Sequence, residues 1–200
     1  MARLIFARHG ESTANLSHTF ANRGESHPLT ALGRTQAEDL VRRLESVGVT
    51  RLFASPLLRA RQTADIVARR LGVAVEMTEA LREFDVGRWE GSSDQAGWDE
   101  YAAVHERWLA GDDQARVGGG ESLQEIRGRV SAFVRSLVAA EGTTTCISHG
   151  GLYRAALPGL LVNVSLEFAL DRPFQNAAWV EATEREGDLW CVEWCGEAVG

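Results

Sequence analysis

Residues 3–15 read RLIFARHGESTAN, a short apolar run that ends on an arginine, a histidine and a glycine. A continuous apolar run of this length is typical of a strand covered on both faces. Basic side chains at the end of a buried strand lose hydration unless they face an anion, and Gly10 allows a ligand to approach the backbone closely. This stretch therefore predicts a buried strand that presents Arg8 and His9 to a negatively charged ligand.

Strands and helices alternate along the rest of the chain. Short apolar runs predict further strands at 51–55, 73–77 and 143–151. Apolar residues at helical spacing predict helices within 30–48, 55–72 and 121–142, the first capped by Thr30 and the second by Ser55. The tail adds two strand-like runs joined by EREGD, which predict a hairpin. This alternation indicates an α/β fold, a three-layer α/β/α sandwich around a mostly parallel central sheet.

Residues 84–118 differ from the rest of the chain, because they are rich in Trp, Gly and Asp and show no clean period. We expect an irregular or partly helical excursion there, a lid-like segment on a single domain spanning residues 1–200. Its large aromatic side chains fit the core as well as they fit the wall of a ligand site. They are Trp89, Trp98, Tyr101 and Trp108.

The composition limits the class of protein. The chain has 200 residues and a formal net charge of −7, which suits one substantial core and leaves no generally basic surface for a nucleic acid. No apolar run approaches the roughly 20 residues of a membrane span, and the N-terminal residues lack a signal-peptide cleavage site. Three cysteines without an export signal favour reduced thiols. We expect a cytoplasmic protein without nucleic-acid or membrane partners, and leave open whether it forms a homodimer.

Basic side chains gather at one edge of the predicted sheet. In parallel sheets ligands bind outside the carboxyl ends of the strands, where His9 and His149 each end a strand. Arg59 falls in the first turn of a helix, where exposed N–H groups favour anions. Each residue alone has an ordinary structural explanation, but together they favour an anion site. A neutral His9 beside Arg8 is suited to attack phosphorus as a nucleophile.

Other chemistries lack their characteristic residues. No HExxH, DxD or clustered Cys and His set is present, and the arginines would repel a cation, so we expect no metal and no cofactor. The chain contains no lysine and no GxxxxGK[ST] loop, and the serine-hydrolase motif G-x-S-x-G is also missing.

Five motifs, in order, resemble those of the histidine phosphatase superfamily, in its phosphoglycerate-mutase-like branch. RHGESTAN is similar to the family's opening R-H-G-E-[ST]-x-x-N, and SPLLRARQTA is similar to S-P-x-x-R-A-x-Q-T-A. HPLTALGRTQA, LREFDVGRWEG and SHGG are similar to three further family motifs. RHG alone is a weak signal, whereas five motifs in register over residues 3 to about 154 are specific.

The resemblance implies roles for the residues that match these motifs. His9 would become phosphohistidine, and Glu83 would protonate the leaving oxygen and later activate water. A clamp would hold the transferring phosphoryl group, formed by Arg8, Asn15, Arg59 and His149. Phosphoryl transfer depends on positioning and on neutralising the charge of the equatorial oxygens, which such a clamp supplies without a metal.

The chain departs from the family pattern where the mutases contact substrate. After Asn15 the mutases carry a Phe-Thr-Gly-Trp run, where this chain has Ala21 and Asn22, and Ser26 replaces an Asp two residues before PLT. The mutases also use a long basic insertion. Here residues 85–116 carry eight negative and three positive side chains, which we interpret as a poor cage for a polyanion.

Together these features predict a metal-independent phosphomonoesterase that hydrolyses a small phosphorylated metabolite through a phosphohistidine on His9. One alternative is a cofactor-dependent phosphoglycerate mutase. The other is an inactive relative that binds a phosphorylated ligand, which the presence of every catalytic position disfavours. Nothing in the sequence names the natural substrate.

Overall fold

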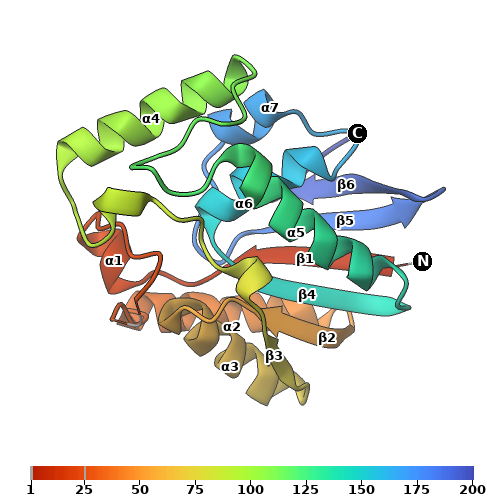
Figure 1. Ribbon diagram of the computed structural model, residues 1–200. Helices are drawn as coiled ribbons and strands as arrows, with labels where there is room; N and C mark the ends of the chain where they lie inside the picture. The colour runs from red at the N-terminus through yellow and green to blue at the C-terminus, as the bar shows by residue number, and fades with distance from the viewer. Residues whose placement is uncertain (1, 25) are drawn as a thin grey trace.

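The computed structural model describes residues 2–24 and 26–200, which contain one mixed sheet with helices on both faces (Figure 1). Within this part of the chain, seven strands lie in the order β3-β2-β4-β1-β5-β6-β7. The strands are β1 Ala2–Arg8, β2 Val49–Ala54, β3 Val75–Met77, β4 Gly142–Ser148, β5 Trp179–Arg185, β6 Asp188–Trp194 and β7 Glu197–Ala198. Strands β1 to β4 pair in parallel, and β5 to β7 add antiparallel pairs at one side.

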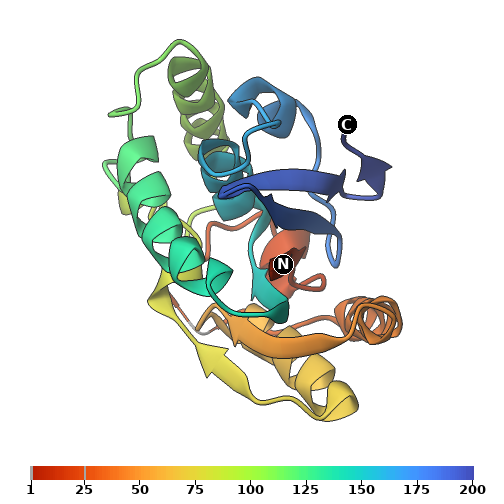
Figure 2. The same cartoon turned by 90° about the vertical axis from the view of Figure 1, so that its right-hand side faces the viewer.

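Helices α2 and α3 cover one face of this sheet, and α5 and α6 cover the other (Figure 1, Figure 2). This arrangement confirms the predicted α/β/α sandwich. The α-helices of the described residues are α1 Thr13–Leu16, α2 Ala31–Glu45, α3 Leu58–Leu71, α4 Gln95–Leu109, α5 Leu123–Val138, α6 Gly150–Ala156 and α7 Leu166–Asp171. Three short 3-10 helices are η1 Glu79–Leu81, η2 Gly87–Trp89 and η3 Leu157–Gly159.

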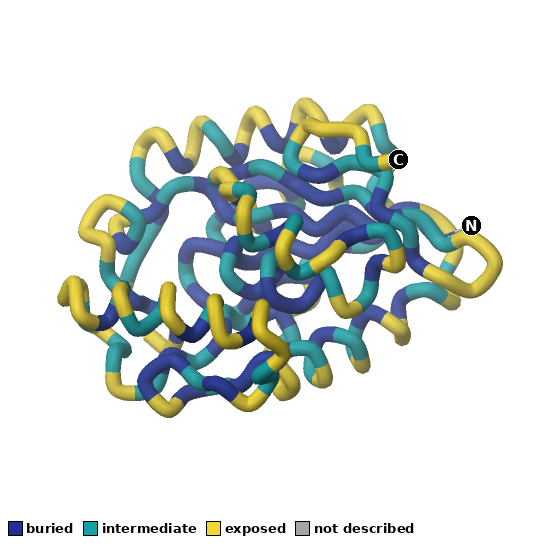
Figure 3. Tube along the Cα trace, turned by 90° about the horizontal axis from the view of Figure 1, so that it is seen from above, coloured by how far each residue is buried: buried dark blue, intermediate teal, exposed yellow. Residues whose placement is uncertain are grey.

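The central strands are buried because both of their faces are covered. On β1, Ile5 belongs to the apolar cluster that includes residues of α2 and α3, whereas Phe6 belongs to the cluster that includes residues of α5 and α6. Figure 3 shows the strands as a buried centre and the outer turns of the helices as exposed. Strands with two apolar faces carry continuous apolar runs, which is why β1 is readable in the sequence.

The two predicted caps have different outcomes. Thr30 caps α2 as predicted, since its Oγ1 accepts the N–H of Gly33. The prediction that Ser55 caps the next helix is wrong, because α3 begins only at Leu58. Ser55 Oγ accepts the N–H of Leu57 at 3.3 Å and so closes the turn before the helix.

The lid-like segment is more regular than predicted. We predicted an irregular or partly helical excursion at 84–118, and residues 95–109 of it form the continuous helix α4, which crosses the top of the molecule in Figure 1. Trp98, Tyr101 and Trp108 recur at helical spacing along α4 and pack against the apolar core. The helical pattern of this segment therefore lies in the spacing of its aromatic side chains.

Two smaller predictions concern the edges of the sheet. The predicted strand at 73–77 is shorter than expected, since β3 begins at Val75. The predicted hairpin is confirmed, because β5 and β6 pair antiparallel across the EREGD turn. None of the helices in residues 2–24 and 26–200 has the length and apolar character needed to cross a bilayer.

Candidate active site

A cavity of about 680 Å³ lies at the carboxyl ends of β1 and β4. Most of the residues that the sequence singled out line it, although they come from four separate segments of the chain. These residues are Arg8, His9, Asn15, Arg59 and Glu83. His149 adjoins them, with its ring centroid 5.1 Å from that of His9.

His9 is buried and both of its ring nitrogens are occupied. Its Nδ1 lies 2.6 Å from the carbonyl oxygen of Gly10, and its Nε2 accepts the Nε–H of Arg59 at 3.0 Å. Burial first, and then the charges of Arg59 and Arg8, hold the pKa of His9 well below its ordinary value of 6.5. The ring is therefore neutral, with its proton on Nδ1 and its lone pair on Nε2.

The glycine that follows His9 has a different function from the one predicted. We expected Gly10 to let a ligand approach, but a Cβ at this position would lie 2.2 Å from the carbonyl oxygen of Gly33. Glycine is therefore required because the loop after β1 presses against the start of α2. This contact fixes the backbone that holds His9.

Two arginines reach the cavity from different elements. Arg59, in the first turn of α3, donates from Nη1 to the carbonyl oxygen of Ala21 at 2.8 Å. Burial lowers the pKa of Arg59 to about 10, so the side chain remains charged at neutral pH. Arg8, at the end of β1, donates to the carbonyl oxygen of Phe174, while its buried Nε has no partner among the described residues.

Glu83 is held by backbone N–H groups. Its carboxylate accepts from Phe84 N at 3.0 Å and from Gly151 N at 3.1 Å. A Cβ at Gly151 would lie 2.8 Å from Oε2, so α6 can approach this close only with glycine there. Burial raises the pKa of Glu83, and the N–H of Phe84 and the positive charge of Arg59 oppose this shift in part.

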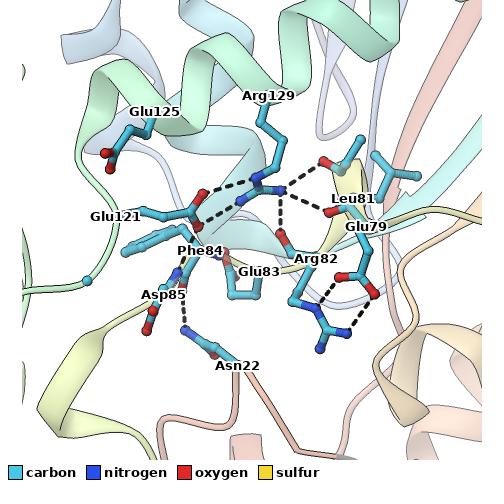
Figure 4. Close-up of polar contacts among 12 residues, drawn as sticks. Asn22, Glu79, Leu81, Arg82, Glu83, Phe84, Asp85, Glu121, Glu125 and Arg129 are labelled. Atoms are coloured by element: carbon cyan, nitrogen blue, oxygen red, sulfur yellow. Dashed lines mark hydrogen bonds and ion pairs between the residues drawn. The ribbon is translucent and has the colours of Figure 1, made fainter.

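A network behind Glu83 fixes its loop (Figure 4). Arg129 of α5 donates to the carbonyl oxygens of Ala80 at 2.9 Å and Arg82 at 3.0 Å. It also forms an ion pair with Glu121 at 2.8 Å, and Glu121 accepts the N–H of Asp85 at 2.9 Å. The chain on both sides of Glu83 is thus tied to one arginine, which restricts where the carboxyl group can lie.

His149 stands at the N-terminus of α6, and its ring has one hydrogen-bond partner among the described residues. Its Nε2 lies 2.7 Å from Ser55 Oγ, while its buried Nδ1 has no hydrogen-bond partner within the described chain. Burial and the charge of Arg59 lower the pKa of His149 well below 6.5. Asn15 lies at the cavity wall, where its Oδ1 accepts the N–H of Ser12 at 2.9 Å.

Several cavity residues were not found from the sequence. Arg154 lies one turn beyond Gly150 on α6, and Gln175 and Asn176 follow α7. The i, i+4 spacing from Gly150 to Arg154 was the available signal for the arginine. Nothing in the pattern of the tail indicated that residues 173–176 turn back to the cavity.

The lid residues divide into two groups. Trp98 and Tyr101 line the cavity, with Trp98 stacked on Phe20 at a centroid distance of 4.0 Å. Trp108 is buried in the core instead, and Trp89 donates to Glu100. The aromatic side chains of α4 thus serve both purposes that the sequence left open.

The interpretation of residues 85–116 as a poor cage for a polyanion stays a prediction, but the charge count is not the reason for it. Neither the eight acidic side chains nor the three arginines of this segment line the cavity. Several are paired elsewhere: Asp85 binds Arg23 at 2.6 Å, and Glu90 accepts backbone N–H groups at Asn22 and Arg23. An acidic segment therefore does not make an acidic cavity, because the direction of each side chain decides what it faces.

Comparisons with known proteins agree with the motifs. A family model described as the histidine phosphatase superfamily (branch 1) matches residues 4–196. A probable phosphoglycerate mutase of Salmonella newport is 33% identical over 152 residues, which are 75% of this chain and 70% of that protein. A mycobacterial glucosyl-3-phosphoglycerate phosphatase is 27% identical with a TM-score of 0.83, over 98% of this chain and 99% of that one.

A putative alpha-ribazole-5'-P phosphatase from Escherichia coli is 25% identical, with a TM-score of 0.80 over 100% of this chain and 98% of that one. The family model, the sequence relatives and the solved structures all agree with the motifs around the cavity. The chain therefore belongs to the histidine phosphatase superfamily, branch 1.

Proposed function

We propose that this chain is a metal-independent phosphomonoesterase that hydrolyses a small phosphorylated metabolite through a phosphohistidine on His9. The observation that carries the proposal is the state of His9, a buried neutral imidazole whose Nε2 lone pair faces Arg59. A neutral histidine is a nucleophile, and the guanidinium groups around it suit a phosphoryl dianion.

In the first step, a phosphoryl oxygen takes over the N–H that Arg59 donates to His9 Nε2. The freed lone pair attacks phosphorus, so the N–P bond forms as the ester P–O bond breaks. Glu83 transfers its proton to the leaving oxygen, and its raised pKa keeps that proton available nearer neutral pH. The Nδ1–H bond to Gly10 stabilises the charge that develops on the ring.

In the second step, the carboxylate of Glu83 takes a proton from water. The water oxygen attacks phosphorus, the N–P bond breaks, and inorganic phosphate leaves with Glu83 again protonated. Arg8 and Arg59 neutralise the equatorial oxygens in both steps. No step of this scheme requires a metal, so we expect full activity in excess EDTA.

Hydrolysis is favoured over mutase activity by the solved structures that resemble this chain. Two phosphatase structures match it over 98% and 100% of its length, including the tail. The relative named as a probable mutase is 33% identical over the 75% of the chain that the sequence alignment covers. Residues 173–176 of that tail line the cavity. The arginine pair that the mutases place in their insertion is also missing. Phosphoglycerate mutase remains the second candidate because of the name of that relative.

One incubation separates these functions. The protein is given 3-phosphoglycerate with catalytic 2,3-bisphosphoglycerate in excess EDTA, and inorganic phosphate and 2-phosphoglycerate are measured together. We expect phosphate and little 2-phosphoglycerate. Efficient isomerisation would show a mutase, and activity that needs an added divalent ion would contradict the metal-free mechanism. Failure to hydrolyse p-nitrophenyl phosphate as well would favour an inactive phospho-ligand-binding relative.

A further inference from the structure

The charged side chains of the cavity are unequal in number. Among the described residues, its lining holds three guanidinium groups, Arg8, Arg59 and Arg154, and one carboxyl group, that of Glu83. Protonation of the leaving oxygen requires Glu83 in its neutral form, which leaves three positive charges. A phosphoryl dianion supplies two negative charges, so one positive charge in the cavity remains without a counter-charge.

Arg154 is the guanidinium that the proposed mechanism does not use. Its Nε donates to the carbonyl oxygen of Ala169 at 3.0 Å, and its Nη2 donates to that of Leu170, at the end of α7. Its Nη1 has no hydrogen-bond partner, and the side chain has no ion pair, among residues 2–24 and 26–200. The two carbonyl contacts therefore hold the guanidinium group of Arg154 in place, while its Nη1 stays available to a ligand.

The position of Arg154 along α6 separates it from the phosphoryl clamp. Gly150 lies against the Arg8 side chain, and Gly151 lies against the Glu83 carboxyl group. Arg154 follows one helical turn later. Because Glu83 serves the leaving oxygen, the organic part of a substrate extends past Glu83 and away from His9, toward this turn of α6.

Tyr101 of α4 lines the same cavity as Arg154. Burial and the charge of Glu83 raise the pKa of the Tyr101 phenol, and the charges of Arg154 and Arg8 oppose this shift in part. At neutral pH the hydroxyl is a neutral donor. A guanidinium and a phenol that face one space form a suitable pair for a carboxylate.

We propose that Arg154, together with Tyr101, forms a second anion subsite that selects phosphomonoesters whose alcohol part carries a carboxylate. This inference rests on the proposed phosphatase function and names the substrate class of the same cavity. It assigns Arg154 as a specificity-determining residue that contacts the substrate away from the reacting phosphorus.

A matched pair of substrates tests the subsite. 3-Phosphoglycerate and glycerol 3-phosphate are three-carbon phosphates that differ only in a carboxylate in place of a hydroxymethyl group. We expect kcat/KM of the unaltered protein to favour 3-phosphoglycerate by about 10- to 100-fold, the usual effect of a hydrogen-bonded charge. In Arg154→Met this preference should fall to within about twofold of unity, whereas Arg154→Lys, which keeps the charge, should retain most of it.

Arg127→Met is the structural control. Arg127, on α5, donates to the carbonyl oxygen of Ala155, which lies on α6 beside Arg154. Arg127 does not line the cavity, so its loss should leave the preference unchanged. An equal preference in the unaltered protein and in Arg154→Met would overturn the proposal. Loss of the preference in Arg127→Met as well would show that the effect is structural.

Measuring binding instead of turnover tests the subsite independently of the proposed catalytic activity. In His9→Ala, which lacks the nucleophile, calorimetry should give the same 10- to 100-fold preference for 3-phosphoglycerate, and adding Arg154→Met should remove it. If this binding preference holds but no phosphate ester is hydrolysed by the unaltered protein, the proposed function fails and the subsite stands. If hydrolysis occurs without any binding preference, the subsite fails and the function stands.

Discussion

Residues of the phosphoryl clamp and of the lid segment line one cavity and differ in their exposure to solvent. At the clamp, the charged Arg59 is 6% exposed, and the neutral rings of His9 and His149 beside it are 2% and 1% exposed. In residues 84–118 several charged side chains are paired near the surface, as in Arg88 with Glu100, and the rings of Trp98 and Tyr101 line the cavity instead. Charges that have lost their water act strongly on a ligand, whereas solvated pairs contribute little. From this difference we expect the clamp to perform the chemistry and the lid to select among substrates.

This comparison makes a general prediction about variants. Changes in the clamp should lower turnover of every phosphate ester, whereas changes in the lid should alter the order of substrates. Each test below measures at least two substrates or two variants for that reason.

Among variants that keep the nucleophile His9, the largest effect on chemistry is expected for Glu83→Gln. Glutamine keeps the size but cannot deliver a proton, so phosphoenzyme formation from alkyl phosphates should fall by roughly 10²–10⁴-fold. Its amide oxygen can accept one of the two backbone N–H groups that Glu83 binds, from Phe84 or from Gly151. The loss should be much smaller with p-nitrophenyl phosphate, whose phenoxide leaves without help. Burst kinetics measure the first step alone. Equal losses for both substrates would mean that Glu83 only positions the phosphate, and His149 would be the next candidate for the proton donor.

A smaller effect is expected for Ser55→Ala. Ser55 Oγ already accepts the N–H of Leu57, so its own proton is available for His149 Nε2, which leaves the ring proton of His149 on Nδ1. That tautomer gives the clamp an N–H donor. Loss of one buried hydrogen bond should lower kcat/KM for all esters about 10-fold.

Nitrogen NMR of His149 checks the cause of this effect. We expect a protonated Nδ1 in the unaltered protein and a mixture of tautomers in Ser55→Ala. Ser55→Thr, which keeps the hydroxyl group, should preserve the Nδ1–H form. A protonated Nε2 in the unaltered protein would contradict the assigned role of Ser55.

The lid should give a selective effect. Trp98 stacks on Phe20 and donates from Nε1 to the carbonyl oxygen of His18 at 3.0 Å. Trp98→Ala removes aromatic surface from the cavity wall, so kcat/KM should fall about 3- to 10-fold for the ring-bearing p-nitrophenyl phosphate. Glycerol 3-phosphate has no ring to stack and should lose less. Equal losses for both esters would place Trp98 with the clamp residues.

The smallest effect concerns stability and pH. Burial lowers the pKa of His149 below 6.5 in the folded chain. Below pH 6.5, His149 therefore binds a proton in the unfolded chain but not in the folded chain. His149 therefore lowers the free energy of unfolding as the pH falls from 6.5 toward its folded pKa. Urea unfolding between pH 7.5 and 5 should show a shallower loss of stability in His149→Asn.

His18→Asn provides the control for this pH effect. His18 is exposed and has a φ of 49°, a conformation that asparagine tolerates. The slope of stability against pH is measured for this exposed-histidine variant beside that of His149→Asn. Identical slopes for His149→Asn and the unaltered protein would show that folding does not change the proton uptake of His149.

The same two regions explain what the sequence could and could not predict. The clamp was found because His9 and His149 follow directly from apolar strands, and the end of a strand fixes where the next residue lies. Arg154 was missed although its i, i+4 spacing from Gly150 places both on one side of α6, because the sequence does not show that α7 holds the arginine beside the cavity. The acidic side chains of the lid show a related difficulty: composition counts charges, whereas Asp85 is already paired with Arg23.

The most direct test of the account is the identity of the phosphorylated residue. Rapid quenching of the protein with a labelled phosphate ester should trap an acid-labile, base-stable phosphoenzyme, and peptide mapping should place the label on His9. His9→Ala should form no phosphoenzyme and show no turnover, while retaining its fold because the ring lies at the end of β1. Recovery of the label on a serine or an aspartate, or full activity of His9→Ala, would contradict the central claim that His9 is the nucleophile.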